Sequence, residues 1–201
     1  IGSGIGSWLY AFTKGGLLLD SAELLDGARQ ASRLITPEAL AHDAVYDVMG
    51  GSAGGILALL AYHRATGDSD ALERALLCGR HLLAHRIETD LGMRSWKSVS
   101  ERPLCGYSHG AAGMAHALLS LHAATGEIAF REAALEAIAY ERACFSPEHG
   151  NWPDLRVAPS EDPAFMCSWC HGAPGIALGR LATLAILDDP PIRHEIAVGL
   201  A

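Results

Sequence analysis

The chain has 201 residues, of which 50% are hydrophobic, 6% aromatic and 19% charged. A chain of this length and apolar content can bury a real core, as one domain or as part of a larger one. Its formal net charge of −8 comes without any cluster of lysine and arginine, which argues against nucleic acid and anionic membranes as partners.

The sequence pattern also argues against membrane insertion and a disulfide framework. The longest apolar run, roughly Gly54 to Tyr62, is far shorter than the ~20 residues that span a bilayer. No signal peptide is visible, and five cysteines are an odd number in a chain of this size. We therefore expect no transmembrane segment, and reduced thiols in a cytoplasmic protein.

In chain order, the predicted elements are helical pairs, each opened by a glycine turn. The turns are Gly4-x-Gly6, Gly51-x-x-Gly54, Gly110-x-x-Gly113 and Gly172-x-x-Gly175. Starts about 60 residues apart indicate one helical pair plus loops per unit. Gly67 and Gly126 lie where a helix is expected to end, at the position that favours the left-handed backbone conformation. Asp68 or Ser69 is expected to cap the helix that follows Gly67.

The first helix of each pair is expected to be more deeply buried than the second. Segments 56–61 and 114–121 are apolar nearly all round, which predicts burial on both sides. The second helix is amphipathic, with Glu132 and Glu136 opposite Ile138, and should face solvent on one side. This pattern predicts an all-α fold, the α/α toroid, with the glycine turns gathered at one end of its inner ring.

Three further local features are predicted. Asp20-Ser-Ala-Glu23 resembles a capping box at a helix start, and the third Gly-x-x-Gly turn runs into a helical segment over 176–187. Segments 89–107 and 146–167 are too long to be simple connectors, so we expect them to border a cleft.

Two of the turns carry chemically active side chains. One contains His109-Gly110-Ala111-Ala112-Gly113, and the other contains Ser168-Trp169-Cys170-His171-Gly172. A titratable histidine and a cysteine–histidine pair on loops of one type suggest a metal-and-base site.

Four blocks, 46–54, 108–113, 151–156 and 168–175, resemble the lanthionine synthetase C-like family, over about residues 2–187. The forms Asn-Trp-Pro-Asp-Leu-Arg and Trp-Cys-His-Gly look most like the cyclase domain of class II, bifunctional lanthipeptide synthetases. The resemblance implies an α/α toroid with a zinc ion, in the bacterial cytoplasm. It also implies addition of peptide cysteine thiols to dehydroalanine or dehydrobutyrine. The partner would be a precursor peptide, with a leader and a dehydrated core.

The resemblance assigns the metal ligand as follows. Cys170 matches one zinc ligand, and the remaining Cys and His ligands are expected beyond Ala201. Residues 1–201 are then a single domain that forms an incomplete toroid without its C-terminal repeat. On its own, such a piece is expected to be inactive and to self-associate through exposed apolar helices.

The other site residues also follow from the resemblance. His109 matches the candidate acid/base, and Asp47 matches an Asp that would orient an imidazole. His171 and Trp169 are interpreted as substrate-binding residues beside the ligand. Each has a structural alternative: Cys170 as an inert buried thiol, and the others as turn, hydrogen-bonding or packing residues.

Two other patterns could indicate a metal or redox site, but each has a simpler structural explanation. Cys167-Ser-Trp-Cys170 has the spacing of a zinc knuckle or redox pair, but no second cysteine pair accompanies it. His81 and His85 lie four residues apart without a third ligand nearby, which favours a solvated helix face over a metal site.

The sequence therefore favours a zinc-dependent lanthionine cyclase. One alternative is a non-catalytic helical module that binds a thiol compound or a leader peptide. Another is a toroidal glycosidase or terpene cyclase, although no convincing carboxylate pair supports the glycosidase.

Overall fold

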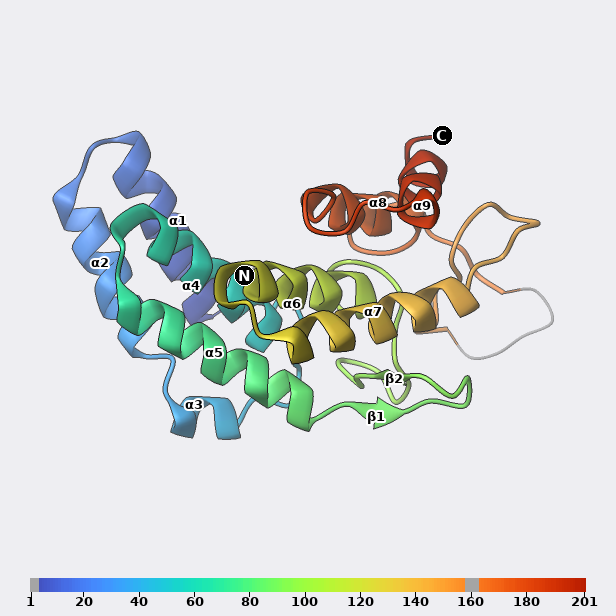
Figure 1. The fold of residues 1–201 in the computed structure, drawn as a ribbon, viewed down its shortest axis with the longest axis horizontal. Helices are drawn as coiled ribbons and strands as arrows, with labels where there is room; N and C mark the ends of the chain where they lie inside the picture. The colour runs from blue at the N-terminus through green and yellow to red at the C-terminus, as the bar shows by residue number, and fades with distance from the viewer. Residues whose placement is uncertain (1–3, 158–162) are drawn as a thin grey trace. The chain divides into compact units, whose positions relative to one another are not determined.

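A computed structural model of the chain describes residues 4–157 and 163–201. Nine helices and one two-stranded sheet lie within these residues (Figure 1). The elements are α1 (Ile5–Leu18), α2 (Ala22–Arg33), α3 (Pro37–Ala41), α4 (Ser52–Thr66), α5 (Ser69–Ala84), β1 (Ile87–Glu88), β2 (Arg94–Ser95), α6 (Ala111–Thr125), α7 (Ile128–Ala143), α8 (Ala173–Ala182) and α9 (Pro190–Leu200). Among these helices, none is both long and apolar enough to cross a membrane. Of the predicted cleft-bordering segment 146–167, residues 158–162 lie outside the described residues.

The chain divides into two compact units, residues 1–84 and 85–201. The first unit contains two helical hairpins, α1 with α2 and α4 with α5 (Figure 1). Their first helices, α1 and α4, pack on each other. This is the predicted repeat of helical pairs, in which consecutive first helices are neighbours.

The second unit repeats this arrangement after a short β-hairpin. Helices α6 and α7 form one hairpin, α8 and α9 form the next, and the first helices α6 and α8 are in contact. Strands β1 and β2 are antiparallel, with Ile87 opposite Ser95. The hairpin is fixed to α7 by Glu136, which accepts hydrogen bonds from the Arg86 side chain (2.8 Å) and the Arg94 backbone N–H (3.0 Å).

The helix ends follow the glycine signals. Gly67 and Gly126 both adopt the left-handed conformation after α4 and α6, with φ of 74° and 76°. Asp68 caps α5 by accepting a hydrogen bond from Ala71 N at 3.1 Å, as predicted. The capping box was predicted one residue too early, because Ser21 is the cap of α2 and accepts from Leu24 N.

Burial and helix length also follow the predicted pattern, with two exceptions. Helices α4 and α6 are buried over nearly their whole length, whereas α5 and α7 each keep a solvent-facing side. The first exception is Glu141 on α7, which is completely buried. The second is the predicted helix over 176–187, since α8 ends at Ala182 and turns follow.

Candidate functional site

Two loops meet in the second unit, just before α6 and α8. We call residues 104–110 the His109 loop and residues 166–172 the Cys170 loop. The Cys170 carbonyl accepts hydrogen bonds from the backbone N–H groups of Tyr107 and Ser108, each at 3.2 Å. The Ser108 hydroxyl donates to the same carbonyl at 3.2 Å. Three donors on one oxygen hold the two loops together.

Glycines permit this close approach. Gly106 has φ +104°, and a Cβ there would lie 2.8 Å from the Cys170 carbonyl oxygen. Gly172 has φ +80°, and a Cβ there would lie 1.7 Å from the Met166 carbonyl oxygen. Both positions combine a left-handed backbone with no room for a side chain, so only glycine fits without rearrangement.

The side chains of the two loops make two close contacts. The His109 and His171 rings lie 5.9 Å apart between centroids. His171 is 4% exposed, whereas His109 and Cys170 are half-buried. The Ser168 hydroxyl lies 3.0 Å from Cys170 Sγ. The structure thus brings the predicted residues His109 and His171 together through their rings, and Cys170 precedes His171 on the same loop.

A carboxylate–guanidinium pair interacts electrostatically with His171. Arg156 donates to both carboxylate oxygens of Asp154, with Nε at 2.9 Å and Nη2 at 2.6 Å. The hydrogen bond from Arg156 holds the pKa of Asp154 below its usual range. Burial lowers the pKa of His171, and the nearby Arg156 charge lowers it further against the opposing effect of Asp154. Arg156 also interacts electrostatically with Cys170.

Asp154 and Arg156 were not among the site residues predicted from the sequence. Both stand in the Asn-Trp-Pro-Asp-Leu-Arg block that contributed to the family resemblance, so the block itself was the available signal. In the same block, Asn151 Oδ1 accepts from Trp152 N and Ala173 N, each at 2.8 Å. Its Nδ2 donates to the Met166 carbonyl at 3.3 Å. Asn151 therefore fixes both the Cys170 loop and the start of α8.

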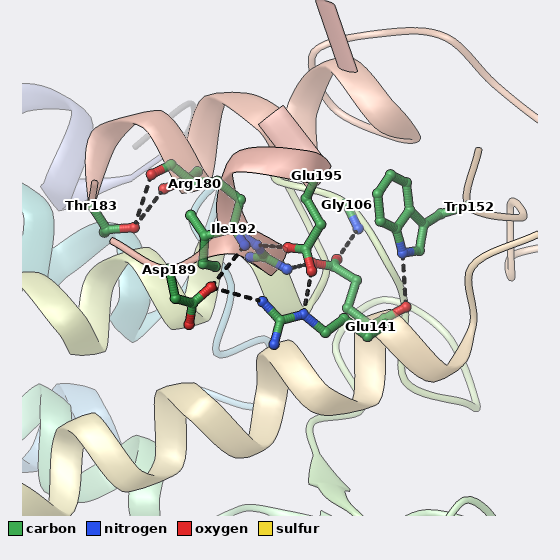
Figure 2. A network of polar contacts seen from close by, with 10 residues as sticks. Gly106, Glu141, Trp152, Arg180, Thr183, Asp189, Ile192 and Glu195 are labelled. Atoms are coloured by element: carbon green, nitrogen blue, oxygen red, sulfur yellow. Dashed lines mark hydrogen bonds and ion pairs between the residues drawn. The ribbon is translucent and has the colours of Figure 1, made fainter. Parts of the chain in front are cut away.

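A buried ionic network lies behind the loops (Figure 2). Arg180 donates to Glu141 at 2.7 Å and to Glu195 at 2.5 Å, and at most 7% of any of these three side chains is exposed. Arg142 donates to Glu195 from the other side. Burial raises the pKa of Glu141 against the lowering effect of Arg180. Burial lowers the pKa of Arg180, but the two glutamates outweigh it and leave the pKa raised.

Glu141 also connects the network to the site. Its second carboxylate oxygen accepts from Gly106 N at 2.8 Å, within the His109 loop. Its backbone carbonyl accepts from Trp152 Nε1 at 2.7 Å (Figure 2). The network therefore sets the position of the loop that carries His109.

Asp47 belongs to the first unit. Its side chain is completely buried and accepts a hydrogen bond from Gly50 N at 2.8 Å. Its backbone carbonyl accepts from Gly51 N and Gly54 N, both at 3.1 Å. These bonds are typical of a turn residue, which is the structural alternative predicted for Asp47 from the sequence.

Three other expectations concern single side chains. Trp169 is 52% exposed, so its indole is accessible at the surface of the Cys170 loop. Cys167 is exposed, and its thiol accepts from Asn151 Nδ2 at 3.4 Å. The prediction that His81 lies on a solvated helix face was wrong. Its ring contacts the Asp43 carbonyl at 3.0 Å and lies against Tyr46, because α5 packs on the turn before α4.

Catalytic zinc usually takes three protein ligands from Cys, His, Asp or Glu. Across residues 4–157 and 163–201, no group of three such side chains is close enough to hold a metal. These residues do not form a complete zinc site by themselves, although Cys170 offers one thiol.

Comparison with known families decides the relationship. A model of the family described as "Lanthionine synthetase C-like protein" matches residues 2–201. The chain belongs to this family. The resemblance seen in the four sequence blocks is thereby confirmed. Comparison with curated proteins finds no match.

Solved structures support the same fold for this lanthionine synthetase C-like chain. Nisin cyclase has a TM-score of 0.72 at 17% identity, over 98% of this chain and 56% of that one. Cellobiose 2-epimerase from Bacillus thermoamylovorans has a TM-score of 0.66 at 13% identity, over 97% and 58%. The family 76 glycoside hydrolase (mannosidase) from Bacteroides thetaiotaomicron has a TM-score of 0.64 at 12% identity, over 98% and 58%.

These likenesses confirm the expected all-α fold of the α/α toroid class. At identities below 20% they speak for the fold alone. The chain spans between 56% and 58% of the length of these three structures.

Proposed function

We propose that this chain is part of a lanthionine cyclase, which adds peptide cysteine thiols to dehydroalanine or dehydrobutyrine to form thioether rings. Membership of the lanthionine synthetase C-like family supports the proposal. The observation that carries it is the tie between the His109 loop and the Cys170 carbonyl. This tie brings the loop that carries His109 against the loop that carries Cys170, which supports roles for both residues in one reaction.

The reaction moves one proton and forms one bond. The substrate thiol loses its proton, its sulfur bonds to the β-carbon of the dehydro residue, and the resulting enolate takes a proton at the α-carbon. In the proposal, His109 takes up or delivers that proton. His171 stays neutral at pH 7, because burial and Arg156 lower its pKa, and it contacts the peptide as a hydrogen-bonding imidazole.

Cys170 is proposed as one ligand of a zinc ion. Its other protein ligands would come from a part of the protein outside this chain. A zinc-bound thiol is deprotonated at neutral pH, which is the chemistry that the ion supplies when bound. Trp169, exposed on the same loop, is proposed to contact the precursor peptide.

The first test separates the thiol of Cys170 from that of its neighbour. The complete protein is compared with its Cys170→Ala and Cys167→Ala variants, measuring zinc content and ring formation on the dehydrated precursor peptide. We expect Cys170→Ala to lose both, and Cys167→Ala, which removes an exposed thiol three residues earlier, to keep both. Retention of zinc and cyclisation by Cys170→Ala would falsify the ligand assignment.

The second test concerns the base. His109→Asn should lower the rate of ring formation by about 10²–10⁴-fold with zinc content unchanged, as is typical when a general acid/base is removed. His194→Asn, a change to an exposed histidine on α9, is the control and should leave the rate unchanged. Equal rates in both variants would contradict the role of His109.

A third experiment decides whether the protein is instead a non-catalytic helical module. Calorimetric titration of the complete wild-type protein with the precursor peptide measures binding independently of turnover. Binding without any ring formation, in protein loaded with zinc, would favour a peptide-binding module over an enzyme.

A further inference from the structure

Two cysteines that have no part in the proposed cyclase reaction lie on neighbouring segments of the second unit. Cys105 is in the His109 loop, and Cys144 is the residue at which α7 ends. Hydrogen bonds on both sides of Cys105 hold its segment against the end of α7: the Tyr140 hydroxyl donates to the Pro103 carbonyl, and Gly106 N donates to Glu141, each at 2.8 Å. The two thiols interact electrostatically. Cys105 is buried, at 4% exposure, whereas Cys144 is half-buried. The pair therefore has one shielded thiol and one that solvent can reach.

Cys144 opens onto a pocket of about 470 Å³. Lys97 and Arg102 line this pocket with Glu88, Asp90 and Glu101, so its wall is strongly charged. The volume is sufficient for a small polar reagent.

Arg102 presents a fixed positive charge on the pocket wall. Its Nε donates to the Leu155 carbonyl at 2.9 Å, and its Nη2 donates to the Val157 carbonyl at 2.7 Å. Two carbonyl partners hold the guanidinium in place without neutralising it. A fixed cation near a thiol favours the thiolate, which is the form that reacts with oxidants.

The two thiols differ in their tendency to ionise. Interaction with the Cys105 thiol lowers the pKa of Cys144, and Arg102 lowers it further, against the opposing effects of burial and of Glu141. The same interaction raises the pKa of Cys105, and burial adds to this. Cys105 thus remains the protonated partner beside a more acidic Cys144.

We propose that Cys144 and Cys105 are a thiol–disulfide redox pair, with Cys144 as the thiol attacked by hydrogen peroxide entering from the pocket and Cys105 as the resolving thiol. In the first step, the Cys144 thiolate attacks one peroxide oxygen, the O–O bond breaks, and sulfenic acid and hydroxide form. In the second step, Cys105 sulfur attacks the Cys144 sulfur, the S–OH bond breaks, and water leaves with the Cys105 proton. Two electrons pass from the thiols to the peroxide.

The disulfide would form inside the scaffold of the candidate site. Cys105 directly precedes Gly106, whose N–H donates to Glu141 and whose α-carbon faces the Cys170 carbonyl. Bringing the two sulfurs to the ~2.05 Å of a disulfide therefore moves a segment held on both sides. The redox pair itself does not depend on the proposed cyclase activity.

Peptide mapping of the complete protein tests the pair directly. Trypsin cleavage separates the cysteines of this chain, since Cys105 falls in peptide 98–131, Cys144 in 143–156, and Cys167 with Cys170 in 157–180. After treatment with hydrogen peroxide, we expect a crosslink between peptides 98–131 and 143–156, about 2 Da lighter than their sum. The crosslink should disappear on reduction with dithiothreitol.

Variants assign the two roles. Cys105→Ala should leave a sulfenic acid on Cys144, which dimedone traps, and Cys144→Ser should leave Cys105 reduced. Cys78→Ser, which removes a buried thiol from the first unit, is the control and should keep the crosslink. Should Cys105→Ala fail to fold, iodoacetamide labelling of the native wild-type protein replaces it, and Cys144 should react at least ~10-fold faster than Cys105.

Three outcomes would overturn the proposal. One is a peroxide-treated protein in which Cys105 and Cys144 both stay reduced. Another is oxidation confined to peptide 157–180. The third is oxidation of Cys105 in Cys144→Ser at the wild-type rate.

Discussion

Replacing Arg180 by methionine should expose the dependence of the second unit on its buried ionic network. Methionine keeps much of the side-chain volume. It removes the hydrogen bonds that Arg180 donates to Glu141 and Glu195 (Figure 2). Glu195 retains Arg142 as a cationic partner. Glu141 keeps the Gly106 N–H but loses the charge that offsets its burial.

The magnitude follows from burial. Removing one partner of a buried ion pair typically costs about 3–5 kcal/mol, because a charge remains without compensation. Arg180 and Glu141 are 1% and 0% exposed, so this range applies to them at pH 7.5. The matched control is Arg193→Met on α9, whose partner Asp188 and own side chain are largely exposed. That change should cost far less, because solvent screens an exposed pair.

The loss should also depend on pH. Burial already raises the pKa of Glu141 above its ordinary 4.5, and without Arg180 it rises further. The folded variant then holds a proton that the unfolded chain releases above about pH 4.5. Stability of Arg180→Met should therefore fall as pH rises from this value through the raised pKa, so its deficit relative to wild type is larger at pH 7.5 than at pH 5.

Urea unfolding of the complete protein, followed by circular dichroism at pH 5 and 7.5, measures these differences. The argument would be refuted by a loss in Arg180→Met no larger than that in Arg193→Met. A loss that is equal at both pH values would refute the assigned state of Glu141.

Three further predictions concern the loops. Arg156→Gln should raise the pKa of Asp154 toward or above its ordinary 3.8, since it removes the hydrogen bonds that favour the carboxylate; NMR titration of the carboxyl carbon measures this. Gly172→Ala should cost at least about 2 kcal/mol more than Gly150→Ala, because both have positive φ but only the first has no room for a Cβ; urea unfolding compares them. Asn151→Ala should cost about 1–3 kcal/mol for each of the two backbone N–H groups that lose their acceptor, measured in the same way.

For each of these three predictions, one outcome would contradict the reasoning. An unchanged pKa in Arg156→Gln would mean that the guanidinium does not favour the carboxylate. Equal stability of the two glycine variants would contradict the close approach at Gly172. A cost below about 1 kcal/mol for Asn151→Ala would show that water replaces the lost acceptor.

The repeat was predictable because glycine and apolar periodicity act locally. Gly67 and Gly126 take the left-handed conformation whatever lies nearby, and an apolar helix must be buried somewhere. The adjacency of the His109 loop and the Cys170 loop could also be predicted. Each loop precedes a first helix of the repeat, and these two helices, α6 and α8, pack on each other.

The buried network could not be predicted, since burial of a charge depends on long-range packing. Glu141 and Arg142 are adjacent on α7, and nothing local says that the first is completely buried and the second partly exposed. Arg180 gave the best available signal, as a lone charge in an apolar helix that must find a partner. Its partners lie 39 residues earlier, at Glu141, and 15 residues later, at Glu195.

His81 shows a second reason for failure. Spacing along a helix says which residues share a face, but not whether another segment covers that face. Here the turn containing Asp43 and Tyr46 covers it. The same limit applies to Asp47, whose turn bonds are local, whereas an orienting role depends on a distant imidazole.

Glu141 receives hydrogen bonds from three separate segments: the His109 loop through Gly106, α8 through Arg180, and the segment after α7 through Trp152. Segments joined at one buried residue tend to open together rather than one at a time. In native-state hydrogen exchange, their amides should therefore share one opening free energy. A substrate that orders any one of them would slow exchange in the other two, although it touches neither.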